Sequence, residues 1–373
     1  MKNFNFWVGT IVVLVGIILT VWGVSIWLAG CTSTVQEEIG STTTITTSTT
    51  SRSSTLTTSS KNSTTTWTTF PTSIPTTMTT TTLPVGVWIE QTPSAAFSPR
   101  EGHTSLLFDS RMWVIGGGTY GPPYGHDVWY STNGKDWFLA TGEAGFIGRK
   151  FHASVIFDNK MWVIGGYNGS NNLNDVWYSS DGVNWTLATA EAGFSGRSGH
   201  GTVVFNNKLW VVGGGTFDGG FNNRLNDVWS SLDGISWTRE VVSAPFAPRA
   251  DHTSVVYDGK IWVIGGFPAF NDVWYSSNGT SWEAATTSAA FDGRGGHASV
   301  VYDNKIWVIG GDAGGVNPYR NDVWSSANGK DWTEEAYSGF PGRRYLSSII
   351  TDKIWIMGGY SPTMFYNDVW YYP

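Results

Sequence analysis

The feature that most constrains the fold of this chain is a repeated pentapeptide. Trp-Val-Ile-Gly-Gly or a close variant begins six times in steps of 45 to 52 residues, at Trp113, Trp162, Trp210, Trp262, Trp307 and Trp355. Arg-x-x-His precedes each copy and Asp-Val-Trp follows it, except that Leu346 replaces the histidine of the sixth copy. A fixed period of this length indicates one supersecondary unit that is repeated along the chain.

Each unit is predicted to form four short antiparallel strands. In the second copy these are residues 152–157, 160–166, 174–179 and 184–189, with hairpin turns at Asp158-Asn159 and Asp181-Gly182. Such dipeptides favour the positive φ angles that two-residue turns require. Four antiparallel strands at this period describe a blade of a β-propeller. The double glycine, the downstream aromatic pair and the Arg-x-x-His opening resemble kelch repeats, which implies an all-β, six-bladed kelch-type propeller over residues 85–373.

The sixth unit is incomplete, because a third tryptophan follows Asp-Val-Trp in the first five units and not in the sixth. Trp88 lies nine residues before Phe97, which is the same step as from Trp137 to Phe146. We therefore expect residues 86–91 to supply the outer strand of the last blade, so that the ring closes without an open sheet edge.

The first 84 residues differ in composition from the repeats. Residues 4–30 are uncharged, mostly apolar and preceded by Lys2, which predicts a helical signal peptide or membrane anchor over residues 1–31. Its end, Leu-Ala-Gly-Cys at 28–31, resembles the lipobox of prokaryotic lipoproteins and implies lipidation of Cys31, with an uncleaved transmembrane helix as the alternative. Residues 32–84 are rich in Thr and Ser and predict a disordered stalk. Both alternatives place the repeats outside the cytoplasm, tethered at the cell surface.

Charge and cysteine content argue against several classes of function. The net charge is −7, and residues 1–84 carry three basic against two acidic residues, so about −8 falls on the repeats. An acidic propeller disfavours nucleic acid as a partner, because phosphates require a basic surface. Cys31 is the one cysteine, so an intrachain disulfide is impossible. The propeller also lacks the cysteine that kelch-type copper oxidases cross-link to a tyrosine.

Residues that recur in every unit are expected to serve the blade rather than a ligand. The Arg-x-x-His side chains are predicted to form hydrogen bonds between neighbouring blades, and the aspartate of Asp-Val-Trp to accept from nearby backbone N–H groups. The glycine pairs are expected to allow positive φ or close approach of backbones. No metal site and no cofactor are predicted, since histidines around a wide channel would not converge on one ion.

Residues that differ between units are the better candidates for a ligand site. The loops between the second and third strands share one face of a propeller with the connections between blades, and their tyrosine and arginine side chains are typical interface anchors. The candidates on these loops and in the Arg-x-x-His openings are Tyr120, Tyr124, Tyr167, Phe217, Phe221, Arg224, Phe270, Tyr319, Arg320, Tyr360, Phe365, Tyr366, Glu101, Lys150, Asp251 and Arg344. Tyr345 is expected near the same channel mouth.

These observations predict a monomeric, surface-tethered module that binds a protein or a glycan through this face. No catalytic residue is assigned, because no pair of titratable groups is recognisable as an acid and a base. A sugar mutarotase or epimerase of the sialic-acid type is the first alternative, since six-bladed kelch proteins with that activity exist and Glu101, Lys150, Asp251 and Arg344 could transfer protons. A structural scaffold of the cell envelope is the second alternative.

Overall fold

A computed structural model describes residues 17–21, 24–28, 87–216, 223–335 and 338–373. The chain divides into two units, residues 1–79 and 80–373. In the first unit, β1 (Ile17–Val21) and β2 (Val24–Leu28) pair as an antiparallel hairpin. The helix and Cys31 predicted for residues 1–31, and the stalk over 32–84, fall largely outside the described residues and stay predictions.

Within the described ranges, no helix is long and apolar enough to cross a membrane.

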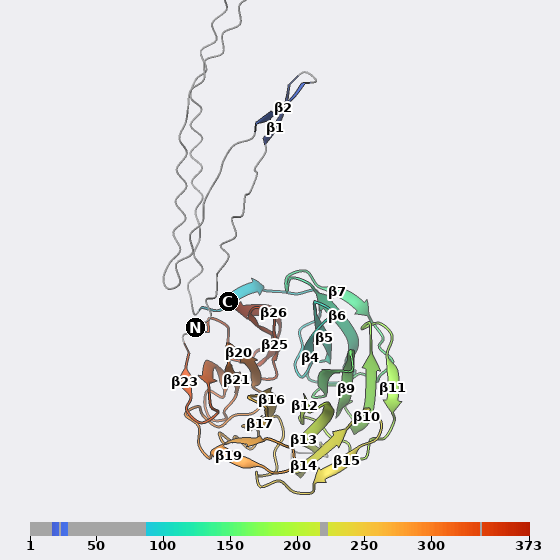
Figure 1. The fold of residues 1–373 in the computed structure, drawn as a ribbon, viewed down its shortest axis with the longest axis vertical. Helices are drawn as coiled ribbons and strands as arrows, with labels where there is room; N and C mark the ends of the chain where they lie inside the picture. The colour runs from blue at the N-terminus through green and yellow to red at the C-terminus, as the bar shows by residue number, and fades with distance from the viewer. Residues whose placement is uncertain (1–16, 22–23, 29–86, 217–222, 336–337) are drawn as a thin grey trace, which may run out of the picture. The chain divides into compact units, whose positions relative to one another are not determined.

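The second unit consists of six four-stranded antiparallel sheets arranged around a central axis (Figure 1). The blades, from the innermost strand outwards, are β4 (Thr104–Phe108), β5 (Arg111–Gly117), β6 (Gly125–Ser131) and β7 (Phe138–Thr141); β8 (Ala153–Phe157), β9 (Lys160–Tyr167), β10 (Asn172–Ser179) and β11 (Thr186–Thr189); β12 (Gly201–Phe205), β13 (Lys208–Thr216), β14 (Asn223–Ser231) and β15 (Thr238–Val241); β16 (Thr253–Tyr257), β17 (Lys260–Ile264), β18 (Val273–Ser276) and β19 (Glu283–Thr286); β20 (Ala298–Tyr302), β21 (Lys305–Asp312), β22 (Tyr319–Ser326) and β23 (Thr333–Glu334); β24 (Ser347–Ile350), β25 (Ile354–Ser361), β26 (Met364–Tyr372) and β3 (Ile89–Thr92). The predicted six-bladed, all-β propeller is confirmed.

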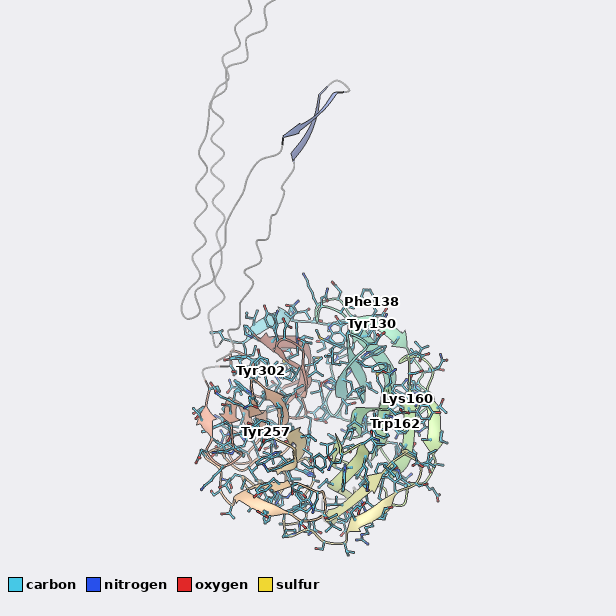
Figure 2. The ribbon with its side chains drawn as sticks, viewed as in Figure 1. Tyr130, Phe138, Lys160, Trp162, Tyr257 and Tyr302 are labelled. Carbon is cyan, nitrogen blue, oxygen red and sulfur yellow. The ribbon has the colours of Figure 1, made fainter. Side chains whose placement is uncertain are left out.

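The second strand of each blade is the most buried, because neighbouring blades cover both of its faces. In β9, the residues from Met161 to Gly166 are all buried, and the apolar run of the repeat supplies this two-sided burial. Lys160 and Trp162 lie on the same side of β9 (Figure 2), and the Trp162 indole donates to the carbonyl of Phe157 over 2.8 Å. The turn residues Asp158 and Asn159 have φ of 48° and 52°, as the hairpin pattern requires.

The ring closes through β3, which pairs antiparallel with β26 in the last blade. Trp88 stands edge-on to Phe340 with ring centroids 5.2 Å apart. The same contact joins Phe97 to Trp137 at 5.1 Å, and it recurs at every other junction between blades. The predicted closure of the last blade by an N-terminal strand is therefore confirmed, and Trp88 is the third tryptophan of that blade.

The recurring arginine and aspartate form one buried unit within each blade. In the first blade, the Arg100 guanidinium donates to both carboxylate oxygens of Asp127 at 2.9 and 2.7 Å and to the carbonyl of Gly116 at 2.7 Å. The Trp129 indole also donates to Asp127. The six arginine–aspartate pairs have N–O distances of 2.5 to 2.8 Å. The aspartate therefore accepts hydrogen bonds mainly from side chains. The charge-assisted pair with arginine is stronger than the bonds to backbone N–H groups that we expected.

The contact to the preceding blade comes from the backbone of the same arginine. The Arg100 amide donates to the carbonyl of Tyr366, and the Arg100 carbonyl accepts from the amide of Gly359, both over 2.9 Å. The arginine side chain therefore stabilises its own blade, while the arginine backbone joins that blade to the preceding one.

Candidate functional site

The site begins with a closed ring of six residues around the channel, one from each blade. Each residue follows the recurring arginine by two positions and has a positive φ between 53° and 63°. Each amide in this channel ring donates to the carbonyl of the equivalent residue in the preceding blade, over 2.6 to 3.2 Å. The channel ring consists of Gly102, Phe151, Gly199, Asp251, Gly296 and Tyr345.

Glycine alternates with a larger residue around the channel ring because there is room for three side chains only. A Cβ atom on Gly102 would stand 2.7 Å from the Phe151 ring, and one on Gly296 would stand 2.8 Å from the Tyr345 ring. A Cβ on Gly199 would collide with Asp251. The three side chains that remain lean over the channel from alternate blades.

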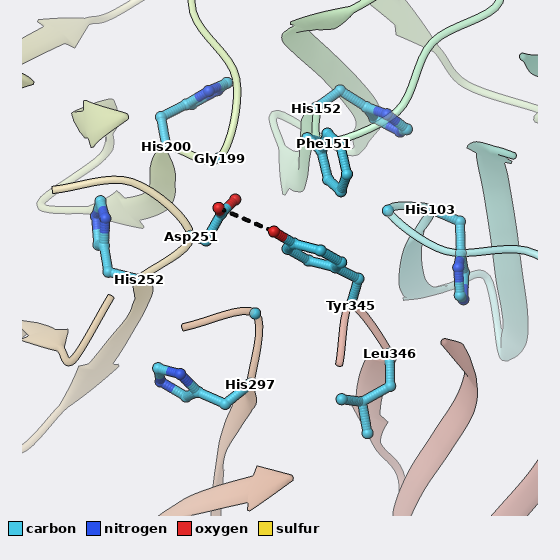
Figure 3. A pocket seen from close by; sticks show the side chains of 12 residues that line it. His103, Phe151, His152, Gly199, His200, Asp251, His252, His297, Tyr345 and Leu346 are labelled. Atoms are coloured by element: carbon cyan, nitrogen blue, oxygen red, sulfur yellow. Dashed lines mark hydrogen bonds between the residues drawn. The ribbon is translucent and has the colours of Figure 1, made fainter. Parts of the chain in front are cut away.

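These three side chains, Phe151, Asp251 and Tyr345, form a plug across the channel (Figure 3). The Tyr345 hydroxyl donates to the Asp251 carboxylate over 3.1 Å, and the Phe151 and Tyr345 rings lie 4.6 Å apart. Around the plug is a cavity of about 120 Å³. Phe151, Asp251 and Tyr345 have φ of 58°, 55° and 53°, in the left-handed region that residues other than glycine seldom adopt.

Burial changes the titration of the plug. It raises the pKa of Asp251 to about 6, while the hydrogen bond from Tyr345 and the positive charges of Arg344 and Arg224 act in the opposite direction. Burial likewise raises the pKa of Tyr345 well above its usual value. Asp251 therefore exchanges a proton near neutral pH while Tyr345 stays protonated.

The five histidines of the Arg-x-x-His openings point into the seams between blades, and three of them reach a hydroxyl of the preceding blade. The Nε2 atoms of His103, His152 and His297 lie 2.8 to 3.0 Å from the hydroxyls of Ser347, Thr104 and Thr253. Burial lowers the pKa of His103, His200 and His297 to about 3, and those of His152 and His252 well below the usual value. The predicted structural role between blades is confirmed for the three bonded histidines.

His200 and His252 lack such a bond, because the residues opposite them are Ala153 and Gly201. Their ring nitrogens are buried without a partner among the described residues. In the sixth unit Leu346 replaces the histidine, and Ala298 stands opposite it at the position of the hydroxyl-bearing residue. Both partners of the hydrogen bond are therefore absent from this seam.

Two ion pairs flank the plug on the loop face. The Lys150 ammonium lies 3.1 Å from Glu101, with both side chains less than 10% exposed. It also lies 4.8 Å from the ring centroids of Tyr124 and Phe151. The Arg344 guanidinium pairs with Asp312 at 2.8 Å. These charges are therefore largely neutralised within the protein.

An aromatic cluster stands beside Arg344, contributed by the first, fifth and sixth blades. Tyr120, Tyr319 and Phe365 surround Tyr360 with ring centroids 4.8 to 5.7 Å from its own. The hydroxyls of Tyr120 and Tyr360 share a hydrogen bond, and this bond together with burial raises the pKa of Tyr360 to about 12. Tyr120 is 70% exposed, so the cluster offers a large aromatic side chain to solvent.

The structure brings together most of the residues predicted for the site. Beside the plug residue Asp251, the residues that line the mouth are Glu101, Lys150, Arg344, Tyr120, Tyr124, Tyr319, Tyr360 and Phe365. Tyr167 packs 6.2 Å from Tyr124 and donates to the carbonyl of Gly169. Arg224 is the second residue of β14, and its charge acts on Asp251.

Other predicted residues have different surroundings. Phe270 lies 4.5 Å from the guanidinium of Arg249, and Tyr366 lies 3.9 Å from that of Arg343, so both pack on the arginines that hold the blades. Arg320 pairs with the exposed Asp292. Phe217 and Phe221 lie outside the described residues.

Sequence reasoning missed two residues of the mouth, Phe151 and Asp312. Phe151 was detectable, because the third residue of the Arg-x-x-His openings alternates between glycine and a larger side chain. Asp312 follows a glycine pair at a position that varies between units, but nothing in the sequence links it to Arg344. Over the described part of the chain, no cluster of three or more His, Cys, Asp or Glu side chains is arranged to hold a metal ion.

Comparison with known proteins identifies a family. The family model described as the KLHDC2/KLHL20/DRC7 Kelch-repeats domain matches residues 77–266 and 231–373. No curated protein matches the chain. The two matched segments overlap and together include all six blades.

Proposed function

Because the chain belongs to this Kelch-repeats family, whose propellers are commonly protein-binding modules, we propose that it binds a protein partner through the loop face around the channel mouth. The observation that carries this proposal is the aromatic cluster at the mouth. Tyr120 is exposed on a platform of packed rings, beside an arginine that is held by Asp312. Rigid aromatic side chains next to arginine are the usual anchors of protein interfaces.

The location of the module is part of the proposal. The apolar segment before residue 31 supports a tether in the membrane, through lipidated Cys31 or a transmembrane helix, and the Thr/Ser tract supports a stalk. The module would then act outside the cytoplasm, at the cell surface. A glycan partner at the same face stays an alternative, since aromatic faces also stack on sugars.

The binding proposal is tested by comparing two exposed aromatic residues. Tyr120→Ser removes the exposed member of the cluster, whereas Phe138→Ser removes a 54% exposed ring from the outer strand β7. Proteins cross-linked to the full-length chain at the cell surface should be lost with Tyr120→Ser and kept with Phe138→Ser. Identical sets of cross-linked proteins for both variants would contradict a binding role for this face.

One observation favours a second candidate function, a sugar mutarotase or epimerase. Asp251, with a pKa near 6, lies at the mouth beside the protonated Tyr345 hydroxyl, and proton transfer near neutral pH requires such a group. NMR exchange spectroscopy of sugar anomers, sialic acid included, would detect catalysis. Acceleration by the wild-type chain and not by Asp251→Asn would establish this activity, while rates equal to those of buffer would dismiss it.

A further inference from the structure

Asp251 differs from the other acidic residues of the mouth because it lacks a cationic partner. Glu101 pairs with Lys150, Asp312 with Arg344, and Asp292 with Arg320. Among the residues that the structure describes, Asp251 forms no ion pair, and the side-chain bond it receives comes from the neutral Tyr345 hydroxyl.

A carboxylate in this position favours a cationic ligand. Removing a carboxylate from water is costly unless a cation and hydrogen bonds replace the water. Arg344 and Arg224 affect Asp251 through space only, and Arg344 is already held by Asp312. The charge of Asp251 is therefore open to compensation from outside the chain.

The surroundings of Asp251 also fit a cation. The rings of Phe151 and Tyr345 contact each other with centroids 4.6 Å apart, and each already lies near a cation of the chain, Lys150 at 4.8 Å and Arg344 at 4.9 Å. Such rings attract ammonium and guanidinium groups. The cavity of about 120 Å³ around them, which the histidines of the Arg-x-x-His openings and Leu346 also line, opens to solvent and has room for a small head group. The propeller as a whole carries about −8, which favours the approach of a basic partner.

We propose that the channel plug is a receptor for a cationic side chain, so that the partner anchors an exposed lysine or arginine beside the rings of Phe151 and Tyr345 and against the carboxylate of Asp251. The ligand's ammonium or guanidinium group replaces the Tyr345 hydroxyl as the donor to Asp251. This inference rests on the proposed function, that the loop face binds a protein.

The test uses small molecules on the full-length chain, with n-butylammonium as a mimic of the lysine side chain. 1-Butanol and butyrate serve as its neutral and anionic counterparts, and binding is measured by saturation-transfer NMR. Wild-type protein should bind butylammonium at least tenfold more tightly than butanol, and butyrate not at all. Equal binding of butylammonium and butanol would overturn the proposal.

Three variants locate the binding. Asp251→Asn keeps the shape and an oxygen for Tyr345, and should weaken butylammonium binding at least tenfold. Tyr345→Phe removes the competing donor and should tighten binding several-fold, an effect in the opposite direction that simple damage to the plug would not produce. Asp292→Asn removes a paired carboxylate at the rim and should change nothing. Undiminished binding by Asp251→Asn would overturn the proposal.

The pH dependence of the wild-type chain gives a readout without any variant. The groups that act on Asp251 are Tyr345, Arg344, Arg224 and Glu101, of which Glu101 disfavours ionisation. Binding of butylammonium should weaken as the pH falls below about 6, because the neutral acid no longer attracts a cation. Affinity that is constant from pH 7.5 to 5 would contradict the assignment. This assay contains no partner protein, so its failure would not contradict protein binding at Tyr120. Failure of the Tyr120 cross-linking comparison would likewise not contradict binding of a cation at Asp251.

Discussion

At the scale of single residues, the seam histidines show how one hydrogen bond decides whether a buried polar side chain stabilises the fold. His297 has the hydroxyl of Thr253 within 2.9 Å, whereas His200 faces Ala153 and its ring nitrogens are unpartnered among the described residues. Both imidazoles are buried and kept neutral. The natural Leu346 shows that an apolar side chain is accepted at this position.

We therefore expect opposite effects from the same substitution at the two sites. His297→Leu removes this hydrogen bond, although Thr253 keeps its bond to Ser299, and should lower the free energy of unfolding by about 0.5–1.5 kcal/mol. His200→Leu removes unpartnered polar atoms and should be neutral or stabilising. Denaturant unfolding of the full-length variants at pH 7.5 measures both, and equal losses would show that the hydroxyl bond is not the deciding interaction.

The lowered histidine pKa values also predict acid sensitivity. The unfolded chain takes up protons on these side chains below pH 6.5, while the folded chain does not until about pH 3. Stability is therefore lost progressively as the pH falls from 6.5 towards 3. His200→Leu should lessen this loss relative to the wild type in unfolding experiments at pH 7 and pH 4.5, and an unchanged difference between the two pH values would contradict the burial argument.

Protonation of Asp251 affects stability in the opposite direction to protonation of the histidines. Its pKa is raised from 3.8 to about 6 in the folded chain, so the neutral form is favoured there. The resulting stability is complete below about pH 4 and is lost as the pH rises through 6, by up to about 3 kcal/mol at about 1.4 kcal/mol per pKa unit. Asp251→Asn should match the wild type at pH 4 and exceed it in stability at pH 7.5. A variant that is no more stable at pH 7.5 would show that the carboxylate is not strained by burial.

At the scale of the element, the outer strand of the last blade is the clearest case of prediction from sequence. Its position followed from the nine-residue step between Trp88 and Phe97, because this step reflects a local geometry that each blade repeats. The structure places Trp88 against Phe340 at the same separation as the other tryptophan–phenylalanine pairs. The repeat spacing in the sequence was therefore sufficient to predict both the blade and its closure by the N-terminal strand.

The candidate site was less predictable, because its contacts join residues far apart in the chain. Tyr345 meets Asp251 across 94 residues, and no spacing in the sequence records that contact. Phe270 and Tyr366 were sensible interface candidates by residue type, but their rings lie over Arg249 and Arg343. Loop composition indicated the face on which these residues gather, whereas the direction of each side chain depended on the assembled ring.

Closure by β3 makes a quantitative prediction about this element. Trp88→Ala removes a side chain that is 3% exposed and should lower the free energy of unfolding by about 3–5 kcal/mol. Trp137→Ala, in an ordinary blade, is the matched control and should cost a similar amount, since Trp137 makes the same contact with Phe97. Urea unfolding of the full-length proteins compares them. A loss at Trp137 without a loss at Trp88 would mean that the terminal strand does not stabilise the propeller.

At the scale of the whole molecule, the channel ring takes one residue from each of the six blades. Its six hydrogen bonds form a closed circle, so each residue is held by the blades on both sides. The interaction between Tyr345 and Asp251 spans this circle and links the sixth blade directly to the fourth. Crowding inside the ring should therefore be transmitted to the complete propeller rather than to one blade.

Gly199→Ala tests this crowding against the cost of backbone conformation alone. Gly199 and Gly259 have φ of 59° and 64°, but Gly259 has no atom within 4 Å of an added Cβ, whereas at Gly199 the Cβ would stand 2.9 Å from the backbone nitrogen of Asp251. Gly259→Ala should cost about 1–2 kcal/mol for the left-handed backbone. Gly199→Ala should cost about 1–3 kcal/mol more, because it overpacks the ring. Thermal unfolding of both full-length variants measures the difference. Equal melting temperatures would show that the ring yields to the added methyl group.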